Sequence, residues 1–449
     1  MNSDFLLISP FAKKLYESYA KNLPIVDYHN HLLLEQLKVG YRFENITKLW
    51  VSADPYKHRA MRILGVEERL ITGNSTDYEK FCAWYACLPR LIGNPLFDWS
   101  VMEMGMVFDY ALLPFDEPET VWNNLNEKLK DMPSSDILGK FHIAYSAPCA
   151  ALDADLTGFR PEEGLCPSLR GDDLLMPSAD YLQKLGRMTD ISISTLEEYI
   201  AAIRIRLDAF RKVGCRFADH ALDNGFTYRS DDGLNEQRFR TLLRGESLTE
   251  EDSVYLSSAI LTALAMEYAQ CGLTLQLHIG AQRTTSTRLR TVAGPAGGYA
   301  AIGKTVELES LTAFLDAVEQ SACGLPRILL FTLNPADNAV LATLSGSYAK
   351  DGCEALVSQG PAWWWCDHYQ GMEQMLDTFA AHSVLSSFVG MTTDSRSLLS
   401  FVRHDYFRRV LCQWLANKVE QGRFPDDEGL LADLIRRVCY ENAKNRLER

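Results

Sequence analysis

Apolar and polar residues follow two periods along this chain. Short, mostly apolar runs of about four to eight residues are typical of buried strands, whereas apolar residues three or four positions apart are typical of helices. The longer segments have the helical period, as at 194–214 and at 403–422, where Gly422 is the expected helix end. The short runs predict eight strands, at 25–31, 141–147, 165–170, 216–222, 273–280, 327–333, 362–366 and 388–394.

Eight alternating strand and helix units predict an α/β fold, a (β/α)8 TIM-like barrel. A doubly wound open sheet is the alternative, but no glycine-rich nucleotide-binding turn follows the first strand. A barrel of this kind takes about 250 residues, so the remaining residues of the chain must form additional structure. Residues 32–141 separate the first two strands and show helical patterns. We therefore expect a single metal-dependent barrel domain over 1–449, with a helical insertion at 32–141 after the first strand.

The composition indicates a folded globular protein and argues against two classes of partner. The chain of 449 residues is 47% hydrophobic and 23% charged, which is typical of a folded globular protein. Its net charge of -14 argues against nucleic acid and against an anionic membrane surface, since both need clustered Lys and Arg. A small anionic substrate stays compatible, because local arginines can reverse the field inside a cleft.

The cysteines and the first residues indicate a compartment. The eleven cysteines occur singly, without a CxxC pair, and residues 1–22 lack the pattern of a signal peptide. No apolar stretch reaches the roughly 20 residues that cross a bilayer. We therefore expect reduced thiols, a cytoplasmic location, and neither a membrane nor a nucleic-acid partner. Enzymes of this size commonly self-associate, so a homo-oligomer is expected.

Two histidines end the first predicted strand, in the sequence PIVDYHNHLLL. Residues i and i+2 of a strand point to the same face, roughly 7 Å apart, so His29 and His31 can approach one metal ion. By itself a His-x-His pattern is more often two strand residues with satisfied hydrogen bonds. The position favours a functional role, because the chemistry of a barrel gathers at the carboxyl ends of its strands.

Asp394 ends the last predicted strand, in GMTTDSRS. The first and last strands of a closed barrel are neighbours, so Asp394 can reach the same ion. The prediction is a mononuclear site of two imidazoles and one carboxylate with open positions, which suits divalent zinc, manganese or iron. A helix N-cap is the alternative role for Asp394, although Ser395 or Ser397 could be the cap instead.

Further polar residues end predicted strands. His278 and Arg170 each close a strand, and Arg396 follows Asp394 by two positions. Arginine binds planar carboxylates through two parallel hydrogen bonds, so two arginines near a metal would suit an acidic sugar. His278 would be a hydrogen-bond partner in the same site. For each of these residues alone, a structural role is the alternative.

Two questions stay open at the level of the residues. Of Asp219 and His220, strand alternation lets only one face the barrel interior. The three tryptophans at 363–365 could stack on a sugar or fill the core, and core is expected for at least two of them.

Several longer runs stand in one order along the chain. They include FLLISPFAKKLYESYAKNLPIVDYHNHL, YKHRAMRILGVEERLITGNSTDYEKF, GCRFADHAL, LQLHIGAQR, AWWWCDHYQGM and GMTTDSRSLLSFVRHDYFRRVLC. Together, and nearly end to end, they resemble the uronate isomerases of the amidohydrolase superfamily. This ordered set is far more specific than His-x-His alone.

The resemblance implies a metal-dependent barrel enzyme that interconverts glucuronate with fructuronate and galacturonate with tagaturonate. The family's metal ligands fall on His29, His31 and Asp394, and the resemblance favours zinc among the candidate metals. Its tyrosine from the loop after strand one falls on Tyr56. Its two substrate-binding arginines fall on Arg170 and on Arg396.

The resemblance also implies a mechanism. Aldose–ketose exchange moves a proton between C2 and C1 through an enediol, and it needs a base, an oxyanion stabiliser and a proton shuttle. By analogy with the family, Asp394 and a metal-bound substrate hydroxyl would share the role of base. Tyr56 would shuttle a proton between the two oxygens, and Arg170 and Arg396 would orient the anionic substrate.

The chain departs from the family pattern at three places. Pro55 stands where the family has a histidine, AYSAPC at 144–149 lacks a carboxylate, and the 294–303 segment lacks the two aspartates expected over 296–301. Proline can neither donate nor accept a proton. Two other hypotheses therefore stay open. One is a diverged isomerase or metal-dependent hydrolase acting on another acid sugar or a lactone, and the other is a non-catalytic sugar-acid binding protein.

Overall fold

The structure is a computed structural model that describes residues 4–223 and 225–448. The chain forms two compact units, and each is described by itself. Unit 1 comprises residues 1–146, 282–302 and 361–445, and unit 2 comprises the remaining segments 147–281, 303–360 and 446–449. The strand β2 (Ile143–Ala151) begins in unit 1 and continues in unit 2.

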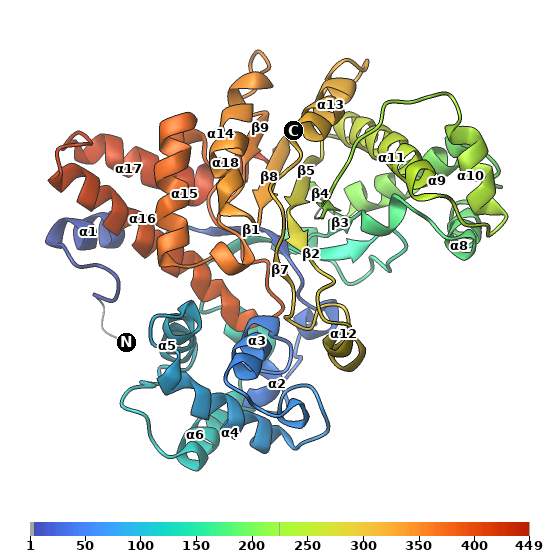
Figure 1. Cartoon of the computed structure of the whole chain (residues 1–449). Coiled ribbons are helices and arrows are strands. Elements are labelled where there is room, and N and C mark those ends of the chain that lie inside the picture. The colour runs from blue at the N-terminus through green and yellow to red at the C-terminus, as the bar shows by residue number, and fades with distance from the viewer. Residues whose placement is uncertain (1–3, 224, 449) are drawn as a thin grey trace. The chain divides into compact units, whose positions relative to one another are not determined.

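Unit 1 is mostly helical. Residues 32–141, the predicted insertion, contain only helices and loops, drawn in blue to cyan in Figure 1. Proline begins several of these helices, where its missing N–H costs nothing. The α-helices of unit 1 are α1 (Pro10–Leu15), α2 (Ile46–Trp50), α3 (Pro55–Ile63), α4 (Asp77–Cys87), α5 (Pro95–Phe108), α6 (Pro118–Lys130), α7 (Ser134–Leu138), α12 (Thr287–Ala293), α15 (Tyr369–His382), α16 (Val402–Glu420), α17 (Glu428–Arg436) and α18 (Asn442–Asn445).

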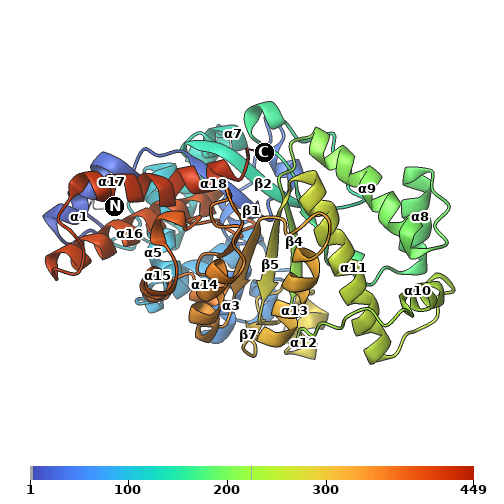
Figure 2. The same cartoon turned by 90° about the horizontal axis from the view of Figure 1, so that it is seen from above.

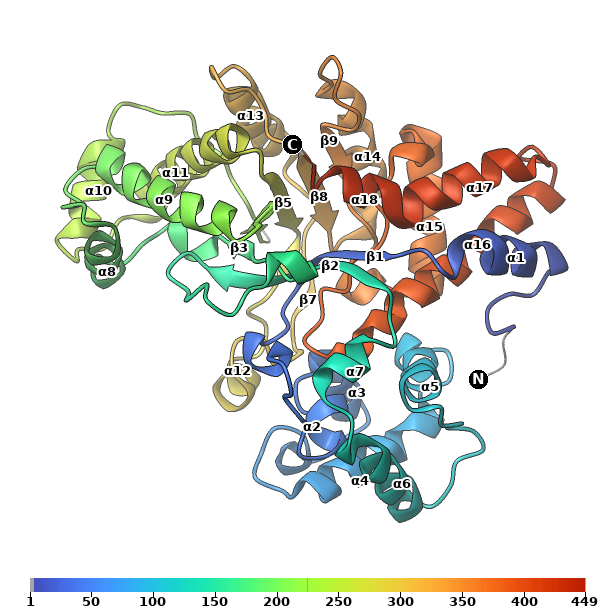
Figure 3. The same ribbon diagram turned by 180° about the vertical axis from the view of Figure 1, so that it is seen from behind.

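The long helix α16 organises one side of unit 1. Its residues Val402–Ala416 are all buried, and a helix that is buried on every side must have neighbours all around it. Helices α1, α5 and α15 pack against it, and Figure 3 shows α1 and α17 alongside it. The helix predicted at 403–422 is confirmed, since the chain leaves α16 just before Gly422, which has a positive φ of 67°.

The strand β1 (Ile25–Asn30) is buried along its whole length. Residues 388–394, predicted as the eighth strand, run beside it, and Asp394 N donates to His29 O at 3.0 Å. This segment is not a regular strand, so the prediction is wrong in that detail. Gly390 has a φ of 76° and Asp394 a φ of 43°, and both values lie outside the β region.

Unit 2 is a parallel sheet with helices beside it. Its strands lie in the order β2-β3-β4-β5-β8-β9, with every neighbouring pair parallel. Figure 2 shows α9 and α11 running alongside β4 and β5. The strands are β3 (Ser168–Arg170), β4 (Phe217–Leu222), β5 (Thr274–Ile279), β8 (Ile328–Thr332) and β9 (Val357–Gln359). Two short strands, β6 (Ala281–Gln282) and β7 (Ala301–Ile302), form a separate pair, of which β7 belongs to unit 1.

The helices of unit 2 bury their apolar faces on this sheet. Helix α9 confirms the predicted helix at 194–214: Thr195 and Glu198 form a capping box, and Ile203 and Leu207 lie in the core. The helices are α8 (Ala179–Thr189), α9 (Leu196–Lys212), α10 (Asn235–Leu243), α11 (Glu250–Cys271), α13 (Leu308–Glu319) and α14 (Asn338–Ser347).

The strand predicted at 362–366 is wrong. Residues Trp364–Cys366 form a short 3-10 helix, and the sheet of unit 2 instead ends with β9. Aromatic residues favour strands because they fit a half-buried pleated surface, and packing elsewhere overrides that preference. Here Trp364 has a positive φ of 45°, which a strand does not permit.

Two features bear on the environment of the chain. No disulfide joins any of the eleven cysteines. Of the helices formed by the described residues, none combines the length and the apolar character that crossing a bilayer requires.

Candidate active site

His29 and His31 leave the carboxyl end of β1 on the same face. His29 is 1% exposed, and His31, directly after the strand, is half-buried. Their rings meet edge to face with centroids 5.1 Å apart. This is the arrangement expected of residues i and i+2 in an extended chain.

Asp394 brings its carboxylate to both imidazoles. Its Oδ1 lies 3.3 Å from His29 Nε2 and 3.0 Å from His31 Nε2. Backbone hydrogen bonds hold the two segments in this register, including one in which His31 N donates to Ser395 O at 2.8 Å. The three residues that the sequence proposed as metal ligands therefore meet within unit 1.

The spacing of these donor atoms fits a metal site. Ligands about 2.0–2.2 Å from one metal ion stand roughly 2.8–3.6 Å from each other, the shorter values at right angles and the longer ones at tetrahedral angles. Both distances from the Asp394 oxygen to the imidazole nitrogens lie in that range. Two imidazoles and a carboxylate therefore suit a divalent ion with positions left for a substrate.

The second oxygen of Asp394 is held by two tryptophans. The indole N–H groups of Trp363 and Trp364 both donate to Oδ2, the latter at 2.6 Å. Burial by itself would raise the pKa of Asp394, but hydrogen bonds and charge from His29 and His31 hold it well below its usual range. The carboxylate is therefore ionised, as a metal ligand or a base must be.

Asp27, two residues before His29, ties β1 to the segment that carries Asp394. The fully buried carboxylate accepts hydrogen bonds from Thr393 N at 2.6 Å and from Thr393 Oγ1 at 2.9 Å. His404 Nε2 lies 3.1 Å from it. These hydrogen bonds fix the position of the residue before Asp394 along β1, and so fix the position of Asp394 relative to the two histidines.

Tyr56 lies in helix α3 rather than in a loop. Asp54 caps this helix, and its side chain accepts from Tyr56 N at 2.9 Å. The phenol ring contacts the Trp99 and Trp365 rings, with centroids 6.1 and 5.2 Å away. Burial raises the pKa of Tyr56 well above its usual value despite the nearby Arg403, so the hydroxyl keeps its proton at neutral pH.

Unit 2 has its own polar cluster at the carboxyl ends of its strands. Arg170 Nη1 lies 3.6 Å from Asp219 Oδ2, and His278 Nδ1 lies 3.8 Å from the same oxygen. Arg170 also pairs with Asp172 at 2.6 Å. Arg170 and His278, both predicted to contact substrate, therefore share one buried carboxylate.

The structure also resolves the choice between Asp219 and His220. Asp219 faces the polar cluster, whereas His220 points to the other side of β4, where its Nε2 lies 2.9 Å from the Tyr268 hydroxyl. Burial lowers the pKa of His220, so the ring is neutral. His220 is a core residue of unit 2.

Arg396 lies in the loop after Asp394 and is partly exposed. Ser397, not Asp394, is the N-cap of the short helix that follows, and its side chain accepts from Leu399 N at 3.3 Å. The alternative role of Asp394 as a helix cap is therefore wrong. The Asp394 carboxylate contacts the two histidines and the two tryptophans instead.

Two of the three departures from the family pattern touch each other. A side chain at Gly298 would lie 2.2 Å from Pro55 O, so glycine lets the 294–303 segment sit directly on the start of α3. Arg62 on α3 donates to Gly297 O, and Arg59 donates to Ala300 O at 3.2 Å. The departures at Pro55 and over 296–301 thus lie on the two sides of one contact.

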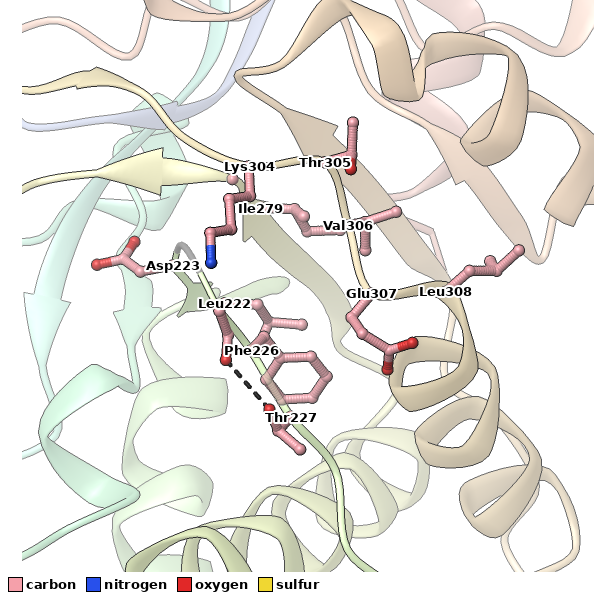
Figure 4. A pocket seen from close by; sticks show the side chains of 12 residues that line it. Leu222, Asp223, Phe226, Thr227, Ile279, Lys304, Thr305, Val306, Glu307 and Leu308 are labelled. Carbon is pink, nitrogen blue, oxygen red and sulfur yellow. Dashed lines mark hydrogen bonds between the residues drawn. The ribbon is translucent and has the colours of Figure 1, made fainter. Parts of the chain in front are cut away.

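A cavity of about 520 Å³ opens at the carboxyl ends of β4 and β5 in unit 2. Leu222 and Ile279, the last residues of these strands, line it, and the Lys304 amine points toward Leu222 (Figure 4). This volume lies within the range of small-molecule sites. The residues predicted as ligands and catalysts are not part of its lining.

Sequence reasoning missed several residues that shape the site. The sequence predicts a core position for at least two of the three tryptophans at 363–365, but only Trp363 is buried. The indoles of Trp363 and Trp364 instead donate to Asp394. Asp27 and Arg403 were not singled out. The only sequence signal for Asp27 is its place two residues before His29, on the same strand face.

Comparisons with known proteins match this chain to uronate isomerases. Residues 1–447 match a family model described as glucuronate isomerase. A uronate isomerase of Caldanaerobacter subterraneus subsp. tengcongensis is 37% identical, over 99% of this chain and 98% of that protein. A uronate isomerase of Serratia proteamaculans is 36% identical over the same shares.

Solved structures agree with this. A crystal structure of uronate isomerase from Thermotoga maritima superposes with a TM-score of 0.91 and 27% identity, covering 100% of this chain and 99% of that one. A glucuronate isomerase from Caulobacter crescentus has a TM-score of 0.89 at 23% identity, covering 100% and 97%. These matches confirm the predicted TIM-like barrel and the family resemblance read from the sequence.

Proposed function

Since the chain belongs to the glucuronate isomerase family and is therefore an isomerase, we propose that it interconverts aldohexuronates and ketohexuronates at a mononuclear metal site. The substrates would be glucuronate and galacturonate, with fructuronate and tagaturonate as products. The observation that carries the proposal is the meeting of His29, His31 and Asp394, with both imidazole nitrogens within 3.3 Å of one carboxylate oxygen.

The proposed metal ligands are His29, His31 and Asp394, with zinc as the first candidate and manganese or iron as alternatives. When bound, the ion supplies positive charge that lowers the pKa of a coordinated hydroxyl. Asp394, whose carboxylate is ionised, accepts the C2 proton of the aldose and returns it to C1. Tyr56, which keeps its proton, donates it to the oxygen on C1 and takes up the proton of the C2 hydroxyl.

The substrate carboxylate would be held by arginine. Arg396 follows the proposed base by two residues, and Arg170 offers a planar guanidinium that already binds the carboxylates of Asp172 and Asp219. A sugar acid would take the place of such a partner, because a guanidinium can bind a carboxylate through two parallel hydrogen bonds. His278, next to Asp219, would donate to a substrate hydroxyl.

The contact between Pro55 and Gly298 favours a second candidate. A polar residue is absent on both sides of this contact, next to Tyr56. The alternative is therefore a diverged isomerase or hydrolase of the same superfamily that acts on another acid sugar or a lactone. Product identity separates the two, because hydrolysis of a lactone consumes water and isomerisation does not.

Turnover of the two hexuronates is the direct test. Purified protein supplied with zinc or manganese should convert glucuronate or galacturonate into a ketose, followed by a ketose-specific colour reaction or by NMR. Failure to convert either acid, with both metals, would reject the isomerase. Stoichiometric metal after gentle purification is also expected, and its absence would favour a sugar-acid binding protein.

Asp394→Asn tests the proposed base. The amide cannot accept a proton, and loss of a group that acts only in the transition state costs roughly 10³-fold or more in kcat. Asp377→Asn is the matched control, because Asp377 also accepts an indole N–H, from Trp414 at 3.0 Å, yet it is part of no proposed site. Unaltered activity in Asp394→Asn would show the base assignment to be wrong.

We further propose a small acidic sugar as the partner, no nucleic-acid or membrane partner, a cytoplasmic location and a homo-oligomer. The absence of disulfides among eleven cysteines supports the location. Sedimentation velocity tests the assembly, since a homo-oligomer has a mass that is a multiple of 50.6 kDa. A sedimenting species of one chain mass would reject it.

A further inference from the structure

Arg403 is a buried cation in an unfavourable place. It is the second residue of α16 and 1% exposed. A helix N-terminus carries partial positive charge, which opposes a cation there, and burial of any charge is costly unless it is paired. The contacts that hold this guanidinium must therefore offset both effects.

Those contacts lead to two groups of the proposed mechanism. The guanidinium lies over the Tyr56 ring at 4.7 Å and over the Trp99 ring at 4.0 Å. Its Nη1 donates to Thr393 O at 3.0 Å and lies 3.6 Å from Asp367 Oδ2. Thr393 directly precedes Asp394 in the chain.

One side chain thus joins three separate segments of unit 1. Tyr56 is the second residue of α3, Thr393 belongs to the segment beside β1, and Arg403 is the second residue of α16. The cation lies over both the Tyr56 and the Trp99 ring, so it restricts where the Tyr56 ring can lie. The proposed proton shuttle and the residue before the proposed base therefore contact the same guanidinium.

We propose that Arg403 is a positioning residue for the isomerisation, which fixes the Tyr56 ring and the peptide before Asp394 relative to each other. The proposal rests on the proposed function of Tyr56 and Asp394. Arg403 itself does not contact the substrate. Its effect belongs to the chemical step, because a misplaced shuttle slows proton transfer without weakening substrate binding.

Arg409 is a matched control on the same helix. It too is buried, lies over a tyrosine ring at 4.4 Å (Tyr16), and pairs with an aspartate at 2.7 Å (Asp405). Arg409 also donates to the Tyr16 hydroxyl at 3.0 Å and to Phe5 O at 3.0 Å, and neither residue is part of a proposed site. Loss of either arginine should lower stability, and only loss of Arg403 should slow the reaction.

The experiment measures kcat and KM for Arg403→Met, Arg403→Lys and the same two changes at Arg409. Arg403→Met should lower kcat about 100-fold, the usual consequence of misplacing a catalytic group by about 1 Å, with KM within about threefold. Arg403→Lys keeps the charge but loses the planar fork, and should recover part of the loss. The Arg409 variants should keep kcat within about twofold. Equal kcat losses at both arginines, or a loss in KM alone, would overturn the proposal.

A double variant isolates the route through Tyr56. In the Tyr56→Phe background the shuttle is already lost, so Arg403→Met should lower kcat by much less than 100-fold further, because residues that act as a unit are not additive. The loss that remains reports the contact with the Thr393 carbonyl. A full additional 100-fold loss would mean that Arg403 does not act through Tyr56. If Arg403→Met does not fold, Arg403→Lys provides the same comparison.

A structural measurement separates this inference from the proposed function. If the wild-type protein converts no hexuronate, the isomerase proposal fails, but the positions of Tyr56 and Thr393 can still be compared in crystals of Arg403→Lys and Arg409→Lys. Tyr56 should shift or become disordered in the Arg403 variant alone. An unmoved Tyr56 ring and Thr393 carbonyl would reject the positioning role.

Discussion

Asp394 carries its carboxylate on a left-handed backbone, with a φ of 43°. For a residue other than glycine this conformation costs roughly 1 kcal/mol or more. Here the hydrogen bond from Asp394 N to His29 O and the two indole donors hold it in place. The strain is offset locally and turns the side chain out of strand alternation, toward both imidazoles.

The sequence could predict which residues form this trio but not how they are held. His29 and His31 follow from a local period, and Asp394 follows from a strand end and the family resemblance. The indoles of Trp363 and Trp364 lie some thirty residues before Asp394 in the chain. No periodicity connects them to it, so their role could not be foreseen.

Asp367 leads to a prediction about pH at the residue scale. The buried carboxyl, next to Arg403, has a pKa of about 7, raised mainly by burial. The folded protein therefore holds this proton up to about pH 7, whereas an unfolded chain releases it near pH 4. Since the folded state binds more protons in this window, stability falls as pH rises from about 4 to 7, by up to about 4 kcal/mol.

Asp367→Asn removes that dependence. Thermal unfolding should show the variant to be more stable than the wild type at pH 8 by about 2–4 °C, given the unfolding entropy of a chain this long, and about equal at pH 4.5. Asp433→Asn, an exposed acid paired with Arg436, is the control and should shift little at either pH. The same difference at both pH values would contradict the raised pKa.

At the scale of elements, helix α3 and the 294–303 segment act together. Asp54 caps α3, Pro55 begins it and Tyr56 follows, while Gly298 lies against the Pro55 carbonyl. Tyr56, the proposed proton shuttle, therefore lies in the capped first turn of α3, where its backbone is held firmly. The family resemblance placed Tyr56 in a loop, but Asp54 and Pro55 are residues that begin a helix, and here they begin α3.

Gly298→Ala tests this contact. The new methyl group would meet the Pro55 carbonyl at 2.2 Å, so the 294–303 segment must move away from α3. The free energy of unfolding should fall. The kcat should fall about tenfold, because small displacements of catalytic groups slow reactions. Unfolding and hexuronate turnover are the measurements.

Gly65→Ala is the control for Gly298→Ala. Gly65 has nearly the same φ, 79° against 80°, but open space where a methyl group would lie. Gly65→Ala should lower the free energy of unfolding by about 1 kcal/mol, the cost of an alanine with a positive φ, and should keep full activity. Equal effects of the two changes would mean that the contact with Pro55 has no role.

At the scale of the whole molecule, a bound metal should stabilise the chain. An ion that binds only the folded state adds about 2.7 kcal/mol when its concentration is 100 times Kd. For a chain of this length this corresponds to a rise in Tm of about 3 °C. Calorimetry with zinc or manganese added to chelator-treated protein measures it.

Variants show whether this stabilisation comes from the proposed ligands. Asp394→Asn should lose most of the metal-dependent shift in Tm, and Asp377→Asn should keep it. A shift that persists in Asp394→Asn would place the ion elsewhere, and no shift in the wild type would argue against a metal site.

The sequence by itself determined the barrel class, the helices α9 and α16, the helical character of residues 32–141 and the family. These depend on periods and ordered motifs that a local run of residues contains. Only the tertiary structure decided that 362–366 is no strand, that Asp394 is turned toward His29 and His31, and that Arg403 lies over the rings of Tyr56 and Trp99. Such contacts join residues far apart in the chain, and packing rather than local preference brings them together.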